Sequence, residues 1–244
     1  MASGKKIVIY STSDGQEGSL YDKMLDETSK LNQYYADKYS HTYKTFKGIK
    51  WGTGAPDSMF NRLFLAVEEA ESAEFDWLIY LDADSYIVHM DDDFIDLLIE
   101  TYPDKMLLRA QQGRSIWGWN TPLFVNLKHE VTLKLFKGWT EVVSYNDSVL
   151  FSLLDIKERI EAGKTEDQAL NELLLDPDIT SFIEENDPQI NWDYFRSNTE
   201  LIPSEYIYGQ TSKFIRHWNS LDDITFRYDQ MKVDIETVSL LLGL

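Results

Sequence analysis

The sequence contains no cysteine. Disulfide scaffolds, thiol nucleophiles and thiolate metal sites are therefore excluded. No apolar run approaches the roughly 18 residues that a membrane span requires, and the apolar cluster at residues 238–244 is much too short. The opening Met-Ala-Ser-Gly-Lys-Lys lacks the pattern of a signal peptide. We therefore expect a cytoplasmic protein without a transmembrane segment, in which residues 1–4 resemble a vector-derived extension.

Basic residues are scarce as well. The chain has 23 Lys and Arg against 42 Asp and Glu, which gives a formal net charge of −19. So acidic a surface repels a phosphate backbone, and we expect no nucleic-acid partner. Because carboxylates are so common here, a single aspartate says little by its presence. Its position relative to the predicted strands carries the information.

Apolar periodicity predicts an α/β fold with strands and helices in alternation. The run at 77–81 is apolar throughout, which is typical of a strand buried on both faces, as in a parallel sheet. The length fits one domain over residues 1–244, with a polar helical insertion at 155–191. We expect strands at 6–10, 43–46, 77–81, 106–109, 123–127, 200–203, 206–208 and 213–218, and helices at 20–38, 60–70, 94–101, 130–137 and 147–154.

Two carboxylates follow the buried strand at 77–81, in the sequence Leu81-Asp82-Ala83-Asp84. Residues i and i+2 share one side of an extended chain, and ligands of open α/β sheets bind beyond the carboxyl ends of strands. Hard oxygen ligands suit Mg²⁺ or Mn²⁺. The sequence therefore predicts a divalent metal site at Asp82 and Asp84. The competing interpretation is a pair of surface carboxylates that cap the helix beginning at Phe94.

An apolar strand that runs into Asp-x-Asp resembles the signature of the GT-A glycosyltransferases. The order of the following segments is similar to that of the retaining galactosyl/xylosyltransferases and their bacterial or viral relatives. These segments are Asn120-Thr121-Pro122-Leu123-Phe124-Val125-Asn126, Tyr145-Asn146-Asp147-Ser148 and Phe214-Ile215-Arg216-His217-Trp218. The resemblance covers residues 5–219. It implies a mixed, mainly parallel Rossmann-like sheet with helices on both faces.

The resemblance also implies an activity and a ligand set. The activity is metal-dependent transfer of a hexose or pentose from a nucleotide-diphosphate sugar, UDP-linked, to a glycan hydroxyl with retention. His217 is expected to join Asp82 and Asp84 around Mn²⁺ or Mg²⁺, although a lone histidine often only packs. Asp147 and Asn120 are expected at the reacting sugar. For Asp147 the alternative is a simple helix N-cap.

Asp82 is expected to contact the ribose of the donor as well as the metal, and four further residues are expected to contact the donor. Arg62 precedes the motif strand, and its guanidinium can bind two oxygens of a phosphate or sugar. The alternative is an exposed arginine paired with a glutamate at position 68 or 69. Ser11 and Thr12 end the first strand and are candidates for the nucleotide base, or else form a polar turn. Trp218 is either a donor contact or a core residue. The remaining histidines, His41, His89 and His129, are expected on the surface.

Two other functions fit the motif in part. A haloacid dehalogenase-type phosphatase also has Asp-x-Asp after an apolar strand, with the first aspartate, here Asp82, as nucleophile. A non-catalytic nucleotide-sugar binder is the other alternative, because the chain departs from the family after His217. Related enzymes often have a glycine there and a lysine further on, whereas Ser220-Leu221-Asp222-Asp223 stands here. The usual basic contact to the diphosphate is therefore missing or supplied from elsewhere.

Overall fold

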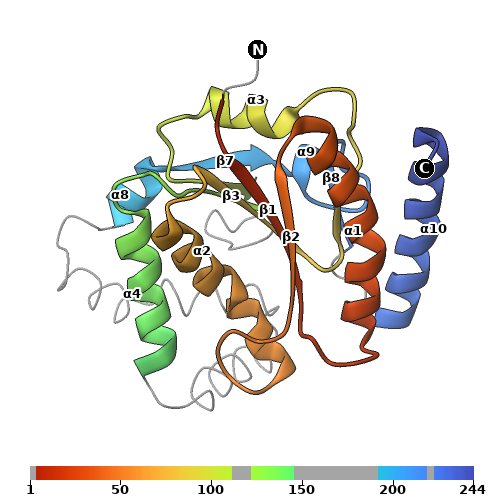
Figure 1. Cartoon of the computed structure of the whole chain (residues 1–244), viewed down its shortest axis with the longest axis horizontal. Helices are drawn as coiled ribbons and strands as arrows, with labels where there is room; N and C mark the ends of the chain where they lie inside the picture. Colours follow the sequence, from red (N-terminus) through yellow and green to blue (C-terminus); the bar gives the residue numbers. More distant parts are fainter. Residues whose placement is uncertain (1–3, 112–121, 146–191, 219–222) are drawn as a thin grey trace.

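The computed structural model describes residues 4–111, 122–145, 192–218 and 223–244. Their centre is a six-stranded sheet in the order β2-β1-β3-β6-β5-β7 (Figure 1). The neighbours β1 and β2, β1 and β3, and β5 and β7 are parallel, whereas β6 runs antiparallel to β3 and β5. The strands are β1 Ile7–Ser13, β2 Thr42–Lys47, β3 Trp77–Asp82, β5 Leu107–Gln111, β6 Leu123–Asn126 and β7 Thr199–Pro203.

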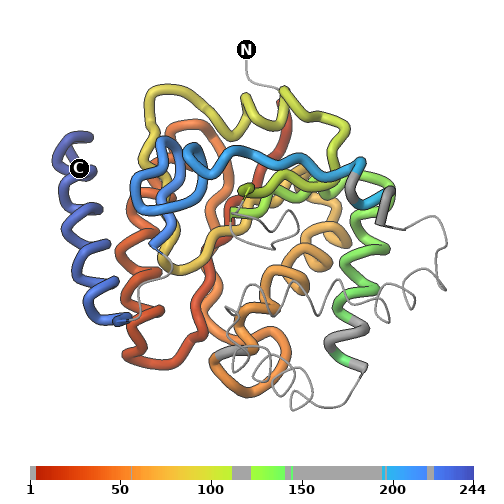
Figure 2. The backbone as a smooth tube through the Cα atoms, turned by 180° about the vertical axis from the view of Figure 1, so that it is seen from behind, coloured from red at the N-terminus to blue at the C-terminus, as the bar shows by residue number. Residues whose placement is uncertain are grey.

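Helices cover both faces of this sheet, as Figures 1 and 2 show from opposite sides. One apolar cluster joins the sheet to α2 Asn61–Ser72, α4 Thr132–Tyr145 and α8 Trp192–Ser197. The other cluster joins it to α1 Leu20–Tyr39, α3 Phe94–Thr101 and α10 Ile224–Leu242. Two shorter helices are η1 Ala55–Phe60 and α9 Ser204–Ile207. The mixed, mainly parallel α/β fold predicted from the sequence is confirmed.

The strand β3 lies between these two clusters. Leu78 and Tyr80 belong to the α2 side, and Trp77, Ile79 and Leu81 belong to the α1 side. All five side chains are buried. An uninterrupted apolar run is what this position requires, because period-two alternation sends side chains to both faces and neither face meets water.

A two-stranded sheet, β4 Ser85–Ile87 with β8 Ile215–His217, follows the end of β3. The two strands are antiparallel, and Ser85 lies opposite His217. The backbone N–H of Trp218 extends the contact by donating to the carbonyl of Asp84 at 3.1 Å. Pairing between segments about 130 residues apart in sequence therefore sets His217 beside the Asp82–Asp84 turn.

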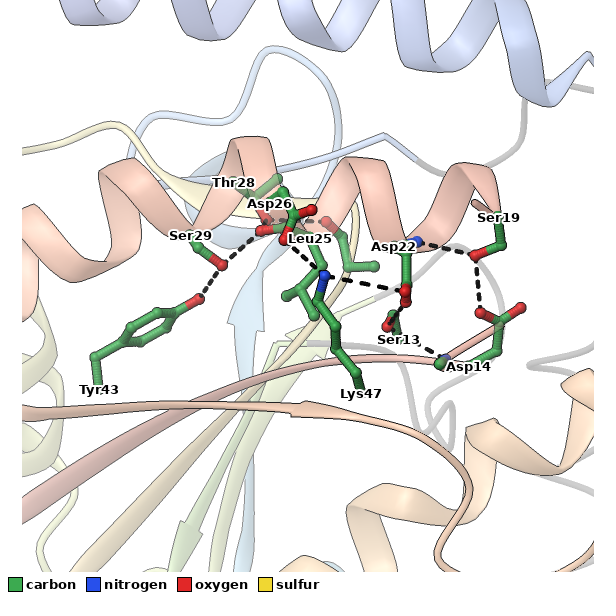
Figure 3. A network of polar contacts seen from close by, with 12 residues as sticks. Ser13, Asp14, Ser19, Asp22, Leu25, Asp26, Thr28, Ser29, Tyr43 and Lys47 are labelled. Carbon is green, nitrogen blue, oxygen red and sulfur yellow. Dashed lines mark hydrogen bonds and ion pairs between the residues drawn. The ribbon is translucent and has the colours of Figure 1, made fainter. Parts of the chain in front are cut away.

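The start of α1 is tied to the end of β1 (Figure 3). Ser19 caps the helix by accepting from the N–H of Asp22 at 3.0 Å, and it donates to Asp14 at 3.0 Å. Asp22 in turn accepts from the hydroxyl of Ser13. The first bond satisfies a backbone N–H that the first turn of a helix leaves open, and the other two hold the start of α1 at the carboxyl edge of the sheet.

One expectation about elements is wrong. Residues 206–208 were expected as a strand, but Tyr206 and Ile207 belong to α9, whose short turn follows Pro203 and closes with a bond from the N–H of Tyr208 to the carbonyl of Ser204. A three-residue alternation is too short to distinguish a strand from a helical turn. The expected helix at 147–154 and the insertion at 155–191 lie outside the described residues.

The C-terminal apolar cluster is the last part of α10, which packs on α1 at one edge of the molecule (Figures 1 and 2). Met231, Ile235 and Val238 face the core, while Leu240 and Leu241 are exposed. None of the helices in the described part of the chain has the length and hydropathy needed to cross a membrane.

Candidate metal and donor site

Asp82, Asp84 and His217 converge where β3 ends. One donor atom from each lies within 4.8 Å of the other two. The Nε2 atom of His217 is 3.2 Å from Oδ1 of Asp84 and 3.7 Å from Oδ2 of Asp82. The three predicted metal ligands are therefore brought together, and the alternative of two carboxylates capping α3 is wrong, since Asp93 caps that helix.

The two carboxylates differ in exposure. The side chain of Asp84 is 5% exposed and that of Asp82 is 27% exposed. Burial acts to raise the pKa of Asp84, but the charge and hydrogen bond of His217, together with Arg227, lower that pKa below its ordinary value. Asp84 is therefore held as a carboxylate inside the protein, and Asp82 faces the side from which a ligand can approach.

His217 is a buried histidine with its ring fixed in place. Its main-chain N–H donates to the carbonyl of Gly209 at 3.2 Å, and its ring meets Tyr208 edge-on with centroids 5.1 Å apart. The strand pairing and this aromatic contact orient Nε2 toward the two aspartates. A ring fixed in this way presents Nε2 in one direction.

Arg62 on α2 approaches the same site from the other side of the sheet. Its Nη2 atom lies 3.5 Å from Oδ1 of Asp82, and its Nε donates to the carbonyl of Met59 at 2.9 Å. Its guanidinium carbon lies 5.4 Å from the ring centroid of Tyr80. The side chain is only 4% exposed, so the alternative of a surface ion pair with a neighbouring glutamate is wrong. Those glutamates pair with lysines of β2 and of the loop after it instead.

Buried polar groups of α1 hold the turn that carries the aspartates. Thr28 donates to the carbonyl of Ala83 at 3.0 Å. The amide of Asn32 donates to the carbonyl of Ser85 at 3.1 Å and accepts from the N–H of Ile87 at 2.9 Å. Each bond satisfies a backbone group that would otherwise be buried without a partner. Sequence reasoning missed both residues, although an asparagine on the apolar face of a helix is a recognisable signal.

The other three residues expected to contact the nucleotide sugar also have partners inside the protein. The hydroxyl of Ser11 accepts from the amide of Asn32 at 3.2 Å, and Thr12 hydrogen-bonds to the hydroxyl of Tyr80. The indole N–H of Trp218 donates to the hydroxyl of Tyr86 at 2.8 Å. All three are buried at the same end of the sheet as the aspartates. Their roles toward a nucleotide stay predictions.

Asn120 and Asp147, the residues expected at the reacting sugar, lie outside the described residues. The same holds for the tryptophan-containing segment at 112–121 and for Ser220. One further expectation is wrong. His41 was expected on the surface, but its side chain is only 6% exposed and lies 3.0 Å from Asp93.

Arg227 in the first turn of α10 is a site residue that sequence reasoning missed. Its Nη1 atom lies 3.3 Å from Oδ2 of Asp84. The helix is held there by Asp234, which accepts from both Arg216 of β8 and the hydroxyl of Tyr86 of β4. Nothing in the local sequence signals this contact, because 143 residues separate Arg227 from Asp84.

The three side chains Asp82, Asp84 and His217 suit a small divalent cation as ligands. Two carboxylates and one imidazole at a strand end are ligands that Mn²⁺ and Mg²⁺ accept, and Asp84 and His217 are already oriented by their own partners. Within the described ranges, these three residues form the group with metal-ligand geometry. Asp82, Asp84 and His217 would therefore hold the ion.

No family model matches the sequence, and no curated protein matches it. Among solved structures, the chain matches the crystal structure of a glycosyltransferase involved in the glycosylation of the major capsid of PBCV-1. The TM-score is 0.61 at 12% identity, over 93% of this chain and 99% of that one. A second match, to A197 from STIV, covers 50% of this chain and 64% of that one at 13% identity with a TM-score of 0.30, which is too low to support an argument. The chain thus has the α/β fold of a solved glycosyltransferase, and its Asp82–Asp84 pair beside His217 fits a DxD motif.

Proposed function

We propose that this protein is a metal-dependent glycosyltransferase. It transfers a hexose or pentose from a nucleotide-diphosphate sugar, UDP-linked, to a hydroxyl of a glycan acceptor with retention of configuration. The observation that carries the proposal is the convergence of Asp82, Asp84 and His217 within 4.8 Å, at the carboxyl end of a central strand, in a fold shared with a glycosyltransferase. Ligands of open α/β sheets bind at such strand ends.

The difficult part of the reaction is the departure of the nucleoside diphosphate, on which negative charge develops. A divalent ion held by the three ligands would offset that charge when bound. Arg62 is buried beside Asp82 and directs a guanidinium to the same place, so it binds a phosphate or sugar oxygen of the donor. Ser11, Thr12 and Trp218 line the end of the sheet on which the nucleotide rests.

The residues proposed to contact the reacting sugar lie outside the described part of the chain. By resemblance, Asp147 orients the acceptor or stabilises the oxocarbenium-like transition state, and Asn120 contacts the sugar. Retention rests on the same resemblance. It is tested by the anomeric configuration of the product, read by NMR.

The proposal is tested by incubating the protein with common UDP-sugars and Mn²⁺ and measuring UDP release. We expect release from at least one donor, and its loss with Asp84→Ala. Asp93→Asn is the matched control, because Asp93 is a half-buried aspartate that also lies against a histidine but is outside the site. Its activity should equal that of the wild type. Absence of UDP release from every donor, with wild type no better than Asp84→Ala, would sink the proposal.

The same samples separate the two alternatives. Tight UDP binding without turnover would favour a nucleotide-sugar binder. Hydrolysis of a generic phosphomonoester, lost in Asp82→Asn, would favour a phosphatase in which Asp82 is the nucleophile.

A further inference from the structure

The buried carboxylate of Asp84 has a neighbour on each oxygen. Nε2 of His217 lies 3.2 Å from Oδ1, and Nη1 of Arg227 lies 3.3 Å from Oδ2. A divalent ion bound to Asp84 would meet the guanidinium of Arg227 as a like charge at this short range. Arg227 and the ion therefore compete for one carboxylate.

Arg227 has contacts that keep it at the site independently of Asp84. Its Nη2 atom donates to the hydroxyl of Tyr21 at 2.9 Å, and its guanidinium carbon lies 5.3 Å from the centroid of the Tyr21 ring. Its Nη1 atom also donates to the carbonyl of Trp218 at 3.4 Å. Tyr21 belongs to the first turns of α1, which the bonds of Figure 3 fix to the end of β1. Arg227 can lose Asp84 as a partner and still remain beside the aspartates.

Two carboxylates and two guanidinium groups lie against each other at the site. Asp82 and Asp84 are negative, Arg62 and Arg227 are positive, and each arginine lies against one aspartate. A divalent ion would add two positive charges to these residues. The diphosphate of a nucleotide sugar carries two negative charges, which would offset those of the ion.

We propose that Arg227 exchanges partners on metal binding: it neutralises Asp84 in the metal-free protein and binds a diphosphate oxygen of the donor once the ion has taken that carboxylate. This inference rests on the proposed function. It assigns to α10 the basic contact that is absent from the sequence Ser220-Leu221-Asp222-Asp223 after His217. Metal and diphosphate binding would then be coupled, because the guanidinium of Arg227 becomes available to the anion when Asp84 binds the ion.

The proposed exchange predicts that Arg227→Gln changes the affinities for Mn²⁺ and for UDP in opposite directions. Affinity for Mn²⁺ alone should rise roughly two- to fivefold, because a competing cation is removed from Asp84. Affinity for UDP in the presence of Mg²⁺ should fall about tenfold or more, because a charge-assisted hydrogen bond is lost. UMP lacks the second phosphate and should be affected less. If Arg227 only positioned Asp84, both the metal and the nucleotide would bind more weakly to the variant.

The test measures Mn²⁺ binding by electron paramagnetic resonance, and binding of UDP, UMP and inorganic pyrophosphate at fixed Mg²⁺ by calorimetry. Lys232→Gln is the matched control, since it removes the same charge from the same helix five residues further on and should change neither affinity. Arg227→Lys keeps the charge and should recover part of the UDP affinity. Unchanged UDP affinity in Arg227→Gln, or a parallel loss of Mn²⁺ affinity, would overturn the exchange.

The result also separates this inference from the proposed function. If the wild type binds pyrophosphate with Mg²⁺ through Arg227 but does not bind UDP, the proposed donor is wrong and the exchange holds. If UDP binds equally well to wild type and Arg227→Gln, the exchange is wrong and the proposed function is unaffected. If the wild type binds neither anion, both are overturned.

Discussion

Two aspartates in the described part of the chain, one buried and one half-buried, lie against a histidine ring in regions with different tasks. Asp84 lies 3.2 Å from His217 at the end of β3, and Asp93 lies 3.0 Å from His41 at the start of α3. At both places burial acts to raise the pKa of the carboxyl, and hydrogen bonding and charge from the histidine help to lower it below its ordinary value. By distance and ionisation alone the two pairs are alike.

Asp84 and Asp93 differ in their other contacts. Asp93 accepts from the hydroxyl of Tyr35 at 2.7 Å and from the N–H of Asp96 at 3.2 Å, so protein donors use its oxygens to cap a helix. Asp84 shares its histidine with a second carboxylate, Asp82, whose Oδ2 lies 3.7 Å from the same Nε2 atom. At both places the contact with a histidine thus helps to keep the carboxylate charged. A metal site of this kind requires a second carboxylate close to the same aspartate and histidine.

The largest difference between the two regions is expected in metal affinity. Asp84→Asn removes a ligand charge and should weaken Mn²⁺ binding more than roughly 100-fold, beyond the loss typical of residues that only support a ligand. Asp93→Asn should leave Mn²⁺ affinity unchanged. Electron paramagnetic resonance of free Mn²⁺ in a titration measures both. Equal Mn²⁺ affinity of the two variants would show that Asp84 and Asp93 do not differ as metal ligands.

The next effect concerns the helix that supports the Asp84 region. Asn32→Ala removes bonds to Ser85, Ile87 and Ser11, and it leaves buried backbone groups without partners. We expect a loss of about 2–3 kcal/mol in the free energy of unfolding, measured by urea denaturation. Gln33→Ala on the exposed side of α1 is the control and should cost less than about 0.5 kcal/mol. A small effect of Asn32→Ala would mean that α1 does not hold the turn.

The Asp93 region should respond to acid. Its pKa is lower in the folded chain than in the unfolded chain, so its ionisation contributes stability above the unfolded value, and that contribution is lost as pH falls through the folded value. At pH 5, Asp93→Asn should cost about 1 kcal/mol of unfolding free energy. The difference from wild type should shrink toward pH 2. A difference that grows as pH falls would contradict the lowered pKa.

The smallest effect is expected at a third aspartate–histidine pair, which lies at the surface. His89 is 2.8 Å from Asp92, but the side chain of Asp92 is 66% exposed. Water and salt weaken such a pair, so Asp92→Asn should change the unfolding free energy by less than about 0.5 kcal/mol. A larger loss, measured in the same denaturation series, would show that exposure to water does not weaken this pair.

The sequence was sufficient for the parts of the site that local pattern determines. The unbroken apolar run of β3 marked a strand buried on both faces, and Asp82 and Asp84 followed it at the edge where ligands bind. The convergence of His217 was predicted only through the order of motifs in a resembling family. Its structural cause is the pairing of β4 with β8. The strand at 213–218 was expected, but the three residues of β4 have no periodicity to detect, and pairing between distant segments leaves no local pattern.

The contacts made between distant segments could not be predicted. Arg227 reaches Asp84 only because α10 packs on α1, and no local feature marks that arginine. Arg62 looked like a polar-face residue, since helical spacing cannot tell that Tyr80 and Asp82 of the adjacent strand cover it. His41 looked like a surface histidine for the same reason.

The central claim is that Asp82, Asp84 and His217 bind one divalent ion. The most direct measurement is anomalous diffraction from crystals soaked in Mn²⁺, with Asp84→Asn crystals as the comparison. We predict a single anomalous peak bounded by these three side chains in the wild type and none there in the variant. The claim would be contradicted if crystals soaked in saturating Mn²⁺ showed no peak among the three side chains. In that case the side chains would pair only with each other and with Arg62 and Arg227.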